Sequence, residues 1–260
     1  MTTYSAITIQ TIDKVATVTI DRAQARNALN RDAIRELTSA FNSLSTNAEI
    51  RCVLLRGSGT DAFCSGADLQ ELQRSDSPEA RREFFLAIAN LVQAIQHCSH
   101  PTVCLVYGFA LAGGLGLVAA SDIVIAADDA QFGLPEVAVG LAPLVVAAPL
   151  SQVLSQRGLD YLALTGERIG APEALKLGLV TKIAPRDSAL NEALSICTII
   201  AARGPAAVQA TKTALRDARA NNSETFIYEL ADRSALVSLG DEASEGVKAF
   251  TDKRAPTWRK

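Results

Sequence analysis

The chain has 260 residues, of which 48% are hydrophobic and 20% charged, and its formal net charge is −3. This length and composition are typical of one large folded domain, or of one domain with an appendage, and they exclude a disordered chain. The slightly negative charge and the 5% of aromatic residues argue against a nucleic-acid binder, which needs a basic surface or aromatic side chains that stack on bases. We therefore expect no nucleic acid among the partners.

The first part of the chain alternates predicted strands and helices. Residues 5–10 and 15–20 alternate apolar and polar side chains around Asp13-Lys14, a pattern that predicts a β-hairpin. Asn30 is expected to cap the helix that follows it. Buried strands are predicted at 52–56, 102–107 and 123–126, and an amphipathic helix is predicted at 79–97, with an apolar side formed by Phe85, Ile88, Leu91, Val92 and Ile95. Short strands that alternate with helices indicate an α/β architecture.

The composition changes after about residue 185, where successive helices are predicted. They are separated at Gly204-Pro205, Asn221-Asn222 and Gly240-Asp241. We therefore divide the chain into a core, residues 1–187, and a C-terminal helical region, residues 188–260. Such a region either packs back on its own core or forms an interface between subunits.

Cysteine and histidine content bears on the compartment and on metal binding. The five cysteines are odd in number and contain no C-x-x-C pair, which is typical of reduced thiols in a cytosol. Residues 1–10 do not resemble a signal peptide, and the most apolar run, 137–150, is too short to cross a membrane. We expect a cytoplasmic protein without a membrane partner. His97 and His100 are interpreted as marking a helix end at a turn rather than a metal site, so no metal is expected.

Two glycine-containing turns follow predicted strands, at residues 63–69 and 108–116. Each leads into a helix and would present free backbone N–H groups there, and two such groups aimed at one oxygen form an oxyanion hole. The alternative is that the glycines only allow tight turns and close packing. Residues 114–119 also match the dinucleotide fingerprint G-x-G-x-x-A, but too many residues separate it from the preceding strand, which argues against a nicotinamide enzyme.

Glu136 is the strongest candidate for a catalytic side chain. No serine lies in a G-x-S-x-G motif, and neither histidine has an evident partner nucleophile, so a hydrolase triad is not indicated. Glu136 lies in the largely apolar run 132–141, where burial would raise its pKa and suit it for proton transfer. The alternative is a solvated carboxylate near the start of a helix.

At these residues the sequence resembles the enoyl-CoA hydratase/isomerase family, the crotonase superfamily. Five ordered segments carry the resemblance, namely residues 21–30, 63–69, 108–122, 130–136 and 165–180. The resemblance implies a crotonase-like spiral of ββα turns that forms two roughly perpendicular sheets. It also implies a C-terminal helical region that makes homotrimers, which often pair into hexamers.

The resemblance further implies a substrate and a binding site. The substrate would be an acyl-CoA, with coenzyme A as part of the substrate and no other cofactor. The thioester oxygen would accept hydrogen bonds from the backbone N–H groups of Ala67 and Gly113. Coenzyme A would contact Arg26, Ala28, Ala67, Asp68 and Leu69 of the same chain. It would also contact Phe250 and Lys253 of a neighbouring subunit.

Departures from the family pattern decide the predicted reaction. Hydratases of the family carry two glutamates, whereas this chain keeps Glu136 and has Gly116 at the other position. The following segment, 142–148, is apolar where hydratases have a glycine-rich turn. This combination resembles the isomerases that move a β,γ double bond of an enoyl-CoA to the α,β position with one glutamate. Hydration of a 2-enoyl-CoA and a non-catalytic acyl-CoA-binding or scaffolding role remain the alternatives.

Overall fold

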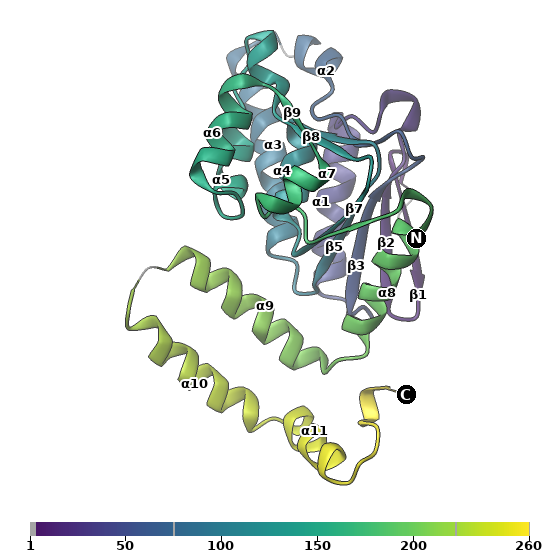
Figure 1. The fold of residues 1–260 in the computed structure, drawn as a ribbon, viewed down its shortest axis with the longest axis vertical. Coiled ribbons are helices and arrows are strands. Elements are labelled where there is room, and N and C mark those ends of the chain that lie inside the picture. The colour runs from purple at the N-terminus through teal and green to yellow at the C-terminus, as the bar shows by residue number, and fades with distance from the viewer. Residues whose placement is uncertain (1–3, 75, 222, 260) are drawn as a thin grey trace.

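The computed structural model describes residues 4–74, 76–221 and 223–259, so Asn222 at a predicted break and residues 1–3 lie outside the described residues. Within these residues, the strands form two sheets (Figure 1). The six-stranded sheet has the order β1 (Ile7–Ile12), β2 (Val15–Ile20), β3 (Cys52–Gly57), β5 (Thr102–Val106), β7 (Ile123–Ala127) and β10 (Lys182–Ala184). The four-stranded sheet has the order β4 (Ala62–Cys64), β6 (Phe109–Leu111), β8 (Gln131–Gly133) and β9 (Arg168–Gly170).

The predicted hairpin is confirmed. Strands β1 and β2 pair antiparallel, with Ile12 opposite Val15. Asp13 and Lys14 between them have φ of 47° and 67°. Two successive residues with positive φ give a two-residue turn whose twist matches that of the flanking strands. The next strand, β3, is parallel to β2, so α1 (Arg31–Ser45) makes the crossover between them.

Helices cover both faces of the six-stranded sheet, which makes its inner strands buried on both sides. On β3, Val53 and Leu55 belong to the larger core, whereas Cys52 and Leu54 point to the opposite face. This alternation follows from the two-residue period of a strand. The larger core lies under α1, α3 (Pro78–Gln96) and α4 (Gly113–Ala120), and α8 (Ala189–Ala201) covers the other face. The predicted buried strands are therefore confirmed.

Two predicted helix ends are confirmed and one helix face is corrected. The Asn30 side chain accepts a hydrogen bond from the Ala33 N–H at 2.9 Å and caps α1, and α3 ends at His97. Phe84 rather than Phe85 belongs to the fully buried side of α3. Phe84 precedes Ile88 by four residues, so it lies on the same helical stripe, and Phe85 is turned about 100° away from it.

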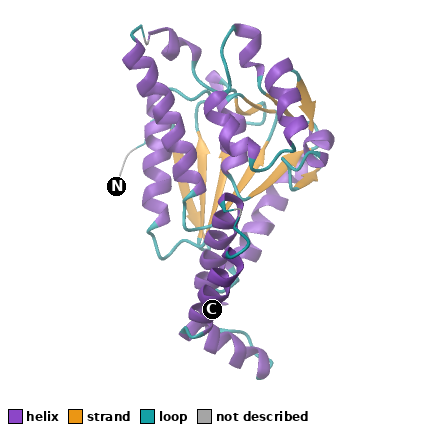
Figure 2. Cartoon of the chain, turned by 90° about the vertical axis from the view of Figure 1, so that its left-hand side faces the viewer, coloured by secondary structure: helices purple, strands orange, loops and turns teal. Residues whose placement is uncertain are grey.

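The C-terminal helices are α8, α9 (Pro205–Ala220), α10 (Phe226–Ser238) and α11 (Asp241–Thr251). Helix α9 is fixed to the core by Lys212, whose Nζ lies 2.7 Å from Asp122 Oδ2 and donates to the His100 carbonyl at 3.0 Å. Helices α10 and α11 extend away from the sheets (Figures 1 and 2). They leave several apolar side chains exposed, namely Ile227, Tyr228, Leu236, Leu239, Val247 and Phe250.

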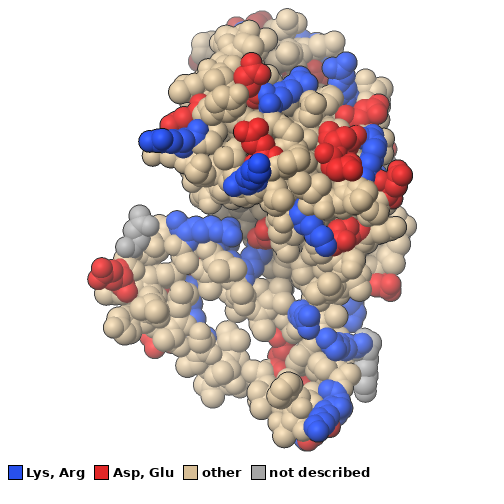
Figure 3. Space-filling model, viewed as in Figure 1, with Lys and Arg blue, Asp and Glu red and all other residues tan. Residues whose placement is uncertain are grey.

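Helices α2 (Leu69–Arg74), α5 (Leu144–Ser151), α6 (Gln156–Thr165) and α7 (Ala171–Lys176) complete the core, together with the short 3₁₀ helix η2 (Pro135–Val139). Charges of both signs are interspersed on the face of the core shown in Figure 3. In the described part of the chain, no single helix is long and apolar enough to cross a membrane, and one pair, Arg186–Ala201 with Pro205–Ala220, meets the criteria of length and composition only across a 109° bend. All five cysteines are buried free thiols.

Candidate active site

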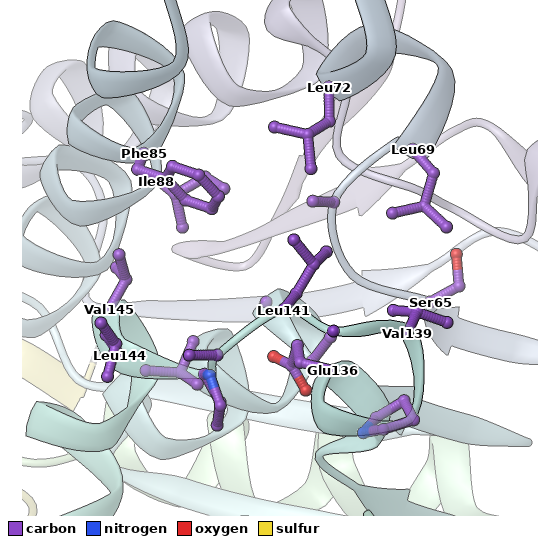
Figure 4. Close-up of a pocket in the computed structure, with 18 residues that line it drawn as sticks. Ser65, Leu69, Leu72, Phe85, Ile88, Glu136, Val139, Leu141, Leu144 and Val145 are labelled. Atoms are coloured by element: carbon purple, nitrogen blue, oxygen red, sulfur yellow. The ribbon is translucent and has the colours of Figure 1, made fainter. Parts of the chain in front are cut away.

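A cavity of about 420 Å³ lies between the turns that follow β4 and β6, the helix η2 and the helices α3 and α5. Its walls are mainly aliphatic and aromatic. In Figure 4, Glu136 and Leu141 lie on one side of the pocket, and Leu72, Phe85 and Ile88 lie on the other. Ala67 and Gly113 line the same cavity. The structure therefore brings together the three residues that the sequence predicted to carry the chemistry.

Neighbouring strands position the two backbone donors. Strands β4 and β6 pair in parallel, so the turns after them leave the sheet at the same edge. The turn after β4 carries Ala67, and the turn after β6 starts α4 at Gly113. A Cβ atom placed on Gly113 would lie 3.6 Å from the Ala67 nitrogen, which shows how closely the two segments approach.

The N–H groups of Ala67 and Gly113 have no protein acceptor within the described part of the chain. Leu29 pairs with the segment around Ala67, because its N–H donates to the Gly66 carbonyl at 2.8 Å and its carbonyl accepts from the Asp68 N–H at 3.0 Å. This pairing skips the Ala67 N–H. Gly113 is the first residue of α4, where a helical N–H has no partner in its own helix. Both donors are therefore available to one oxygen in the cavity.

Close packing also shapes both turns. The glycines therefore allow tight turns and close packing as well as presenting N–H groups. Gly66 has φ of +96°, and a Cβ atom on it would lie 2.6 Å from the Ala112 Cβ. Ala112 itself has φ of +51°, a conformation that favours glycine. Its N–H donates to the Gly133 carbonyl at 3.0 Å, which helps to hold this strained residue. Strain of this kind at a cavity wall is typical of functional sites.

Glu136 lies in η2 and is half-buried, with its Oε2 atom shielded from solvent. Pro135 starts this helix, and Gly140 ends it with φ of +74°. Among the described residues, Glu136 Oε2 has no hydrogen-bond partner. Burial raises the pKa of this carboxyl above its ordinary value of 4.5, because the apolar surroundings disfavour the charged form. The buried Oε2 atom agrees with the predicted desolvated carboxylate, and the place of Glu136 in the first turn of η2 agrees with the predicted helix start.

Comparison with known proteins places this cavity in a family. The family model of enoyl-CoA hydratase/isomerase matches residues 10–260. The chain belongs to the enoyl-CoA hydratase/isomerase family. A probable enoyl-CoA hydratase of Mycobacterium bovis is 34% identical over 256 residues, which cover 98% of each chain. A short-chain-enoyl-CoA hydratase of Clostridium acetobutylicum is 31% identical over 243 residues, covering 93% of this chain and 92% of the relative.

Solved structures of enoyl-CoA hydratases share the fold. The enzyme of Mycobacterium smegmatis has a TM-score of 0.94 at 30% identity and covers 98% of this chain and 100% of its own. The enzyme of Bacillus anthracis has a TM-score of 0.93 at 28% identity, with 98% and 99% covered. The predicted crotonase fold is confirmed, and the protein is an enzyme of the enoyl-CoA hydratase/isomerase family that acts on acyl-CoA thioesters.

Sequence reasoning missed one residue beside the acyl-CoA site of this family member. The Arg22 guanidinium donates to Asp68 Oδ2 at 3.2 Å and also to the Ala28 carbonyl. Because Asp68 follows Ala67 directly, this ion pair holds the segment that carries one backbone donor. Arg22 lies two positions after the end of β2, in the segment 21–30 that carries the family resemblance, and its place in that segment could have pointed to it.

The predicted coenzyme A contacts are spread over several places in the structure. Leu69 lines the main cavity and is exposed, whereas Arg26 lines a separate, smaller cavity of about 110 Å³. Ala28 is buried. Phe250 is 87% exposed on α11, and neither it nor Lys253 lines the cavity of its own chain. Their predicted contact with a neighbouring subunit's coenzyme A stays a prediction.

Proposed function

We propose that this enzyme moves the double bond of an enoyl-CoA from the β,γ to the α,β position, with Glu136 as its single acid–base group. One observation carries the proposal. Among the described residues that line the cavity, Glu136 is the only carboxylate, and it shares this largely apolar cavity with two unpaired N–H donors. Isomerisation needs one group that removes and returns a proton, whereas addition of water in this family uses a second carboxylate.

The proposed reaction proceeds in two proton transfers. The Glu136 carboxylate removes a proton from the α carbon of a 3-enoyl-CoA, and the electron pair shifts to give a dienolate. The N–H groups of Ala67 and Gly113 stabilise the negative charge on the thioester oxygen. The Glu136 carboxylic acid then returns the proton to the γ carbon, which leaves a 2-enoyl-CoA and restores the carboxylate. This chemistry uses only the chain and the acyl-CoA, so we propose no further cofactor.

The raised pKa of Glu136 predicts the pH dependence of the reaction. The base must be ionised, and its ionised fraction falls as the pH drops through the raised pKa. We therefore expect kcat/KM to decline on the acid side with a midpoint above 4.5, the ordinary value for glutamate. A pH profile of kcat/KM tests this expectation. A midpoint at or below the ordinary value would contradict the role of burial.

A comparison of two substrates tests the reaction type. We expect kcat/KM for the isomerisation of a 3-enoyl-CoA to exceed kcat/KM for the hydration of a 2-enoyl-CoA of equal chain length. Absorbance of the conjugated thioester follows both reactions, because it rises on isomerisation and falls on hydration. A preference for hydration would overturn the isomerase proposal. The role of Glu136 as a base would then be tested by substitution of Glu136.

Hydration is the second candidate function, and the names of the relatives favour it. The relatives from Mycobacterium bovis and Clostridium acetobutylicum are both called enoyl-CoA hydratases. For this chain, hydration would require Glu136 alone to activate the water and protonate the α carbon. The apolar walls of the cavity weigh against a bound water, because such a water needs two to four polar partners.

We also propose that the enzyme is a homotrimer or a hexamer of two trimers in the cytoplasm. The exposed apolar side chains of α10 and α11 support an assembly, since a face of this kind is normally covered. Phe250 and Lys253 lie on this part of the chain, in keeping with a role at a neighbouring site. The reduced, unpaired cysteines support the cytoplasmic location. Light scattering tests the assembly.

A further inference from the structure

Val146 fills the space directly beside Gly116. A Cβ atom placed on Gly116 would lie 2.5 Å from Val146 Cγ1 and 3.2 Å from Val146 Cβ. The first separation is far below ordinary van der Waals contact between carbon atoms. The glycine in the middle of α4 is therefore matched to the valine on α5, and the two helices approach each other through this pair.

Val146 has little freedom to move away. It is 3% exposed and belongs to the larger hydrophobic core. A valine in a helix has one strongly preferred rotamer, so the methyl group near Gly116 cannot be turned aside at low cost. Interiors packed in this way do not yield to an extra atom without a shift of the backbone.

Val146 also separates position 116 from the substrate. Val146 lines the cavity, whereas Gly116 does not. Leu141, Leu144 and Val145 continue the same apolar wall (Figure 4). A side chain at position 116 could reach the cavity only by displacing Val146. The absence of a carboxylate at position 116 and the presence of valine at position 146 are therefore linked, because the valine occupies the space that a side chain at position 116 would need.

We propose that Val146 determines the reaction of this enzyme, because it occupies the place that a second carboxylate at position 116 would need. This inference rests on the proposed isomerase function and deepens it. With Val146 in place, the proton held by Glu136 can return only to a carbon of the substrate. The specificity for isomerisation then depends on a pair of residues rather than on Gly116 alone.

Thermal unfolding tests the steric part of the proposal without any assay of activity. Gly116→Ala is expected to lower Tm, although alanine is the better helix former. In the Val146→Ala background the contact at 2.5 Å is removed and the nearest atom of residue 146 is its Cβ, at 3.2 Å, so the same substitution should lower Tm much less. Gly114→Ala is the matched control, because its Cβ would lie 2.5 Å from the backbone oxygen of Cys64, which Val146→Ala does not relieve. An equal loss from Gly116→Ala in both backgrounds would overturn the proposal.

Rates of hydration and isomerisation test the catalytic part. Gly116→Glu alone is expected to leave the ratio of hydration to isomerisation unchanged, and Val146→Ala alone should do the same because an apolar void stays dry. The double variant should raise this ratio by about 10²-fold, the lower end of what one acid–base group contributes. An equal gain from Gly116→Glu alone, or no gain from a double variant that folds, would overturn the proposal.

The outcome for Val146 is separable from the outcome for the proposed function. A wild-type enzyme that fails to isomerise a 3-enoyl-CoA contradicts the proposed function. The rate of hydration in the double variant, relative to Gly116→Glu alone, still decides whether Val146 blocks the second carboxylate. If the double variant does not fold, the Tm comparison of the alanine variants decides it.

Discussion

Glu136→Gln is expected to lower kcat for acyl-CoA turnover by about 10²–10⁴-fold, the range typical of one general acid–base group. The amide has nearly the shape of the carboxylate but cannot accept the α proton. Among the described residues no hydrogen bond depends on Glu136 Oε2, so an amide nitrogen at that place breaks no hydrogen bond of this atom while the substitution removes a desolvated charge. We therefore expect Tm to stay the same or to rise. Steady-state kinetics and a thermal scan measure both effects.

Glu167→Gln is a matched control for this substitution. Glu167 is exposed on the loop before β9 and does not line the cavity, so its amide variant should keep the wild-type kcat. Binding of a non-reactive acyl-CoA should survive in both variants, which separates a loss of chemistry from a loss of the site. If Glu136→Gln retains more than about a tenth of the wild-type kcat, well above the loss expected for a general base, another group carries the proton.

The parts of the site that were predictable are those that local sequence encodes. Glycines directly after a predicted strand indicate a turn with free N–H groups, and the structure has such turns at Ala67 and Gly113. An acid within an apolar run indicates a buried carboxylate, and the Oε2 atom of Glu136 is buried. The family resemblance then assigned a common substrate to three residues that are far apart in the chain.

Contacts between distant segments were not predictable in the same way. The sequence showed that segment 142–148 is apolar, but it does not identify the residues that this segment contacts. Val146 meets Gly116, thirty positions earlier, only because α4 and α5 pack together in the fold. The ion pair of Arg22 with Asp68 has the same origin, since the segment after the hairpin and the turn after β4 meet only in three dimensions.

Burial on a helix face was predictable to within one residue. Phe84 and Phe85 are adjacent and equally apolar, so hydrophobic periodicity could not separate the core-facing ring from its neighbour. The structure gives them different environments, because Phe84 packs in the core and Phe85 lines the cavity. Their rings still contact each other edge to face, with centroids 5.9 Å apart. The predicted core residue is thus a wall of the site.

Gly113→Ala is expected to leave the fold intact and to lower kcat by about 10²–10³-fold, the cost typical of one lost oxyanion donor. The new Cβ would lie at least 3.4 Å from its neighbours, which is ordinary van der Waals contact, so Tm should not fall. The methyl group would nevertheless lie 3.6 Å from the Ala67 nitrogen and would be bonded to the Cα of Gly113, so it would lie close to both donors. A thioester oxygen that must reach both nitrogens within about 3 Å then meets this methyl group.

Gly114, the next residue in the chain, provides a control for this prediction. Gly114→Ala places a Cβ 2.5 Å from the Cys64 oxygen and 2.8 Å from the Cys64 Cβ, so it should lower Tm. Two adjacent substitutions of the same kind are therefore expected to act in different ways, one on catalysis and the other on stability. Kinetics and thermal scans of both variants measure the difference. Full activity in a folded Gly113→Ala enzyme would contradict the placement of the oxyanion hole between Ala67 and Gly113.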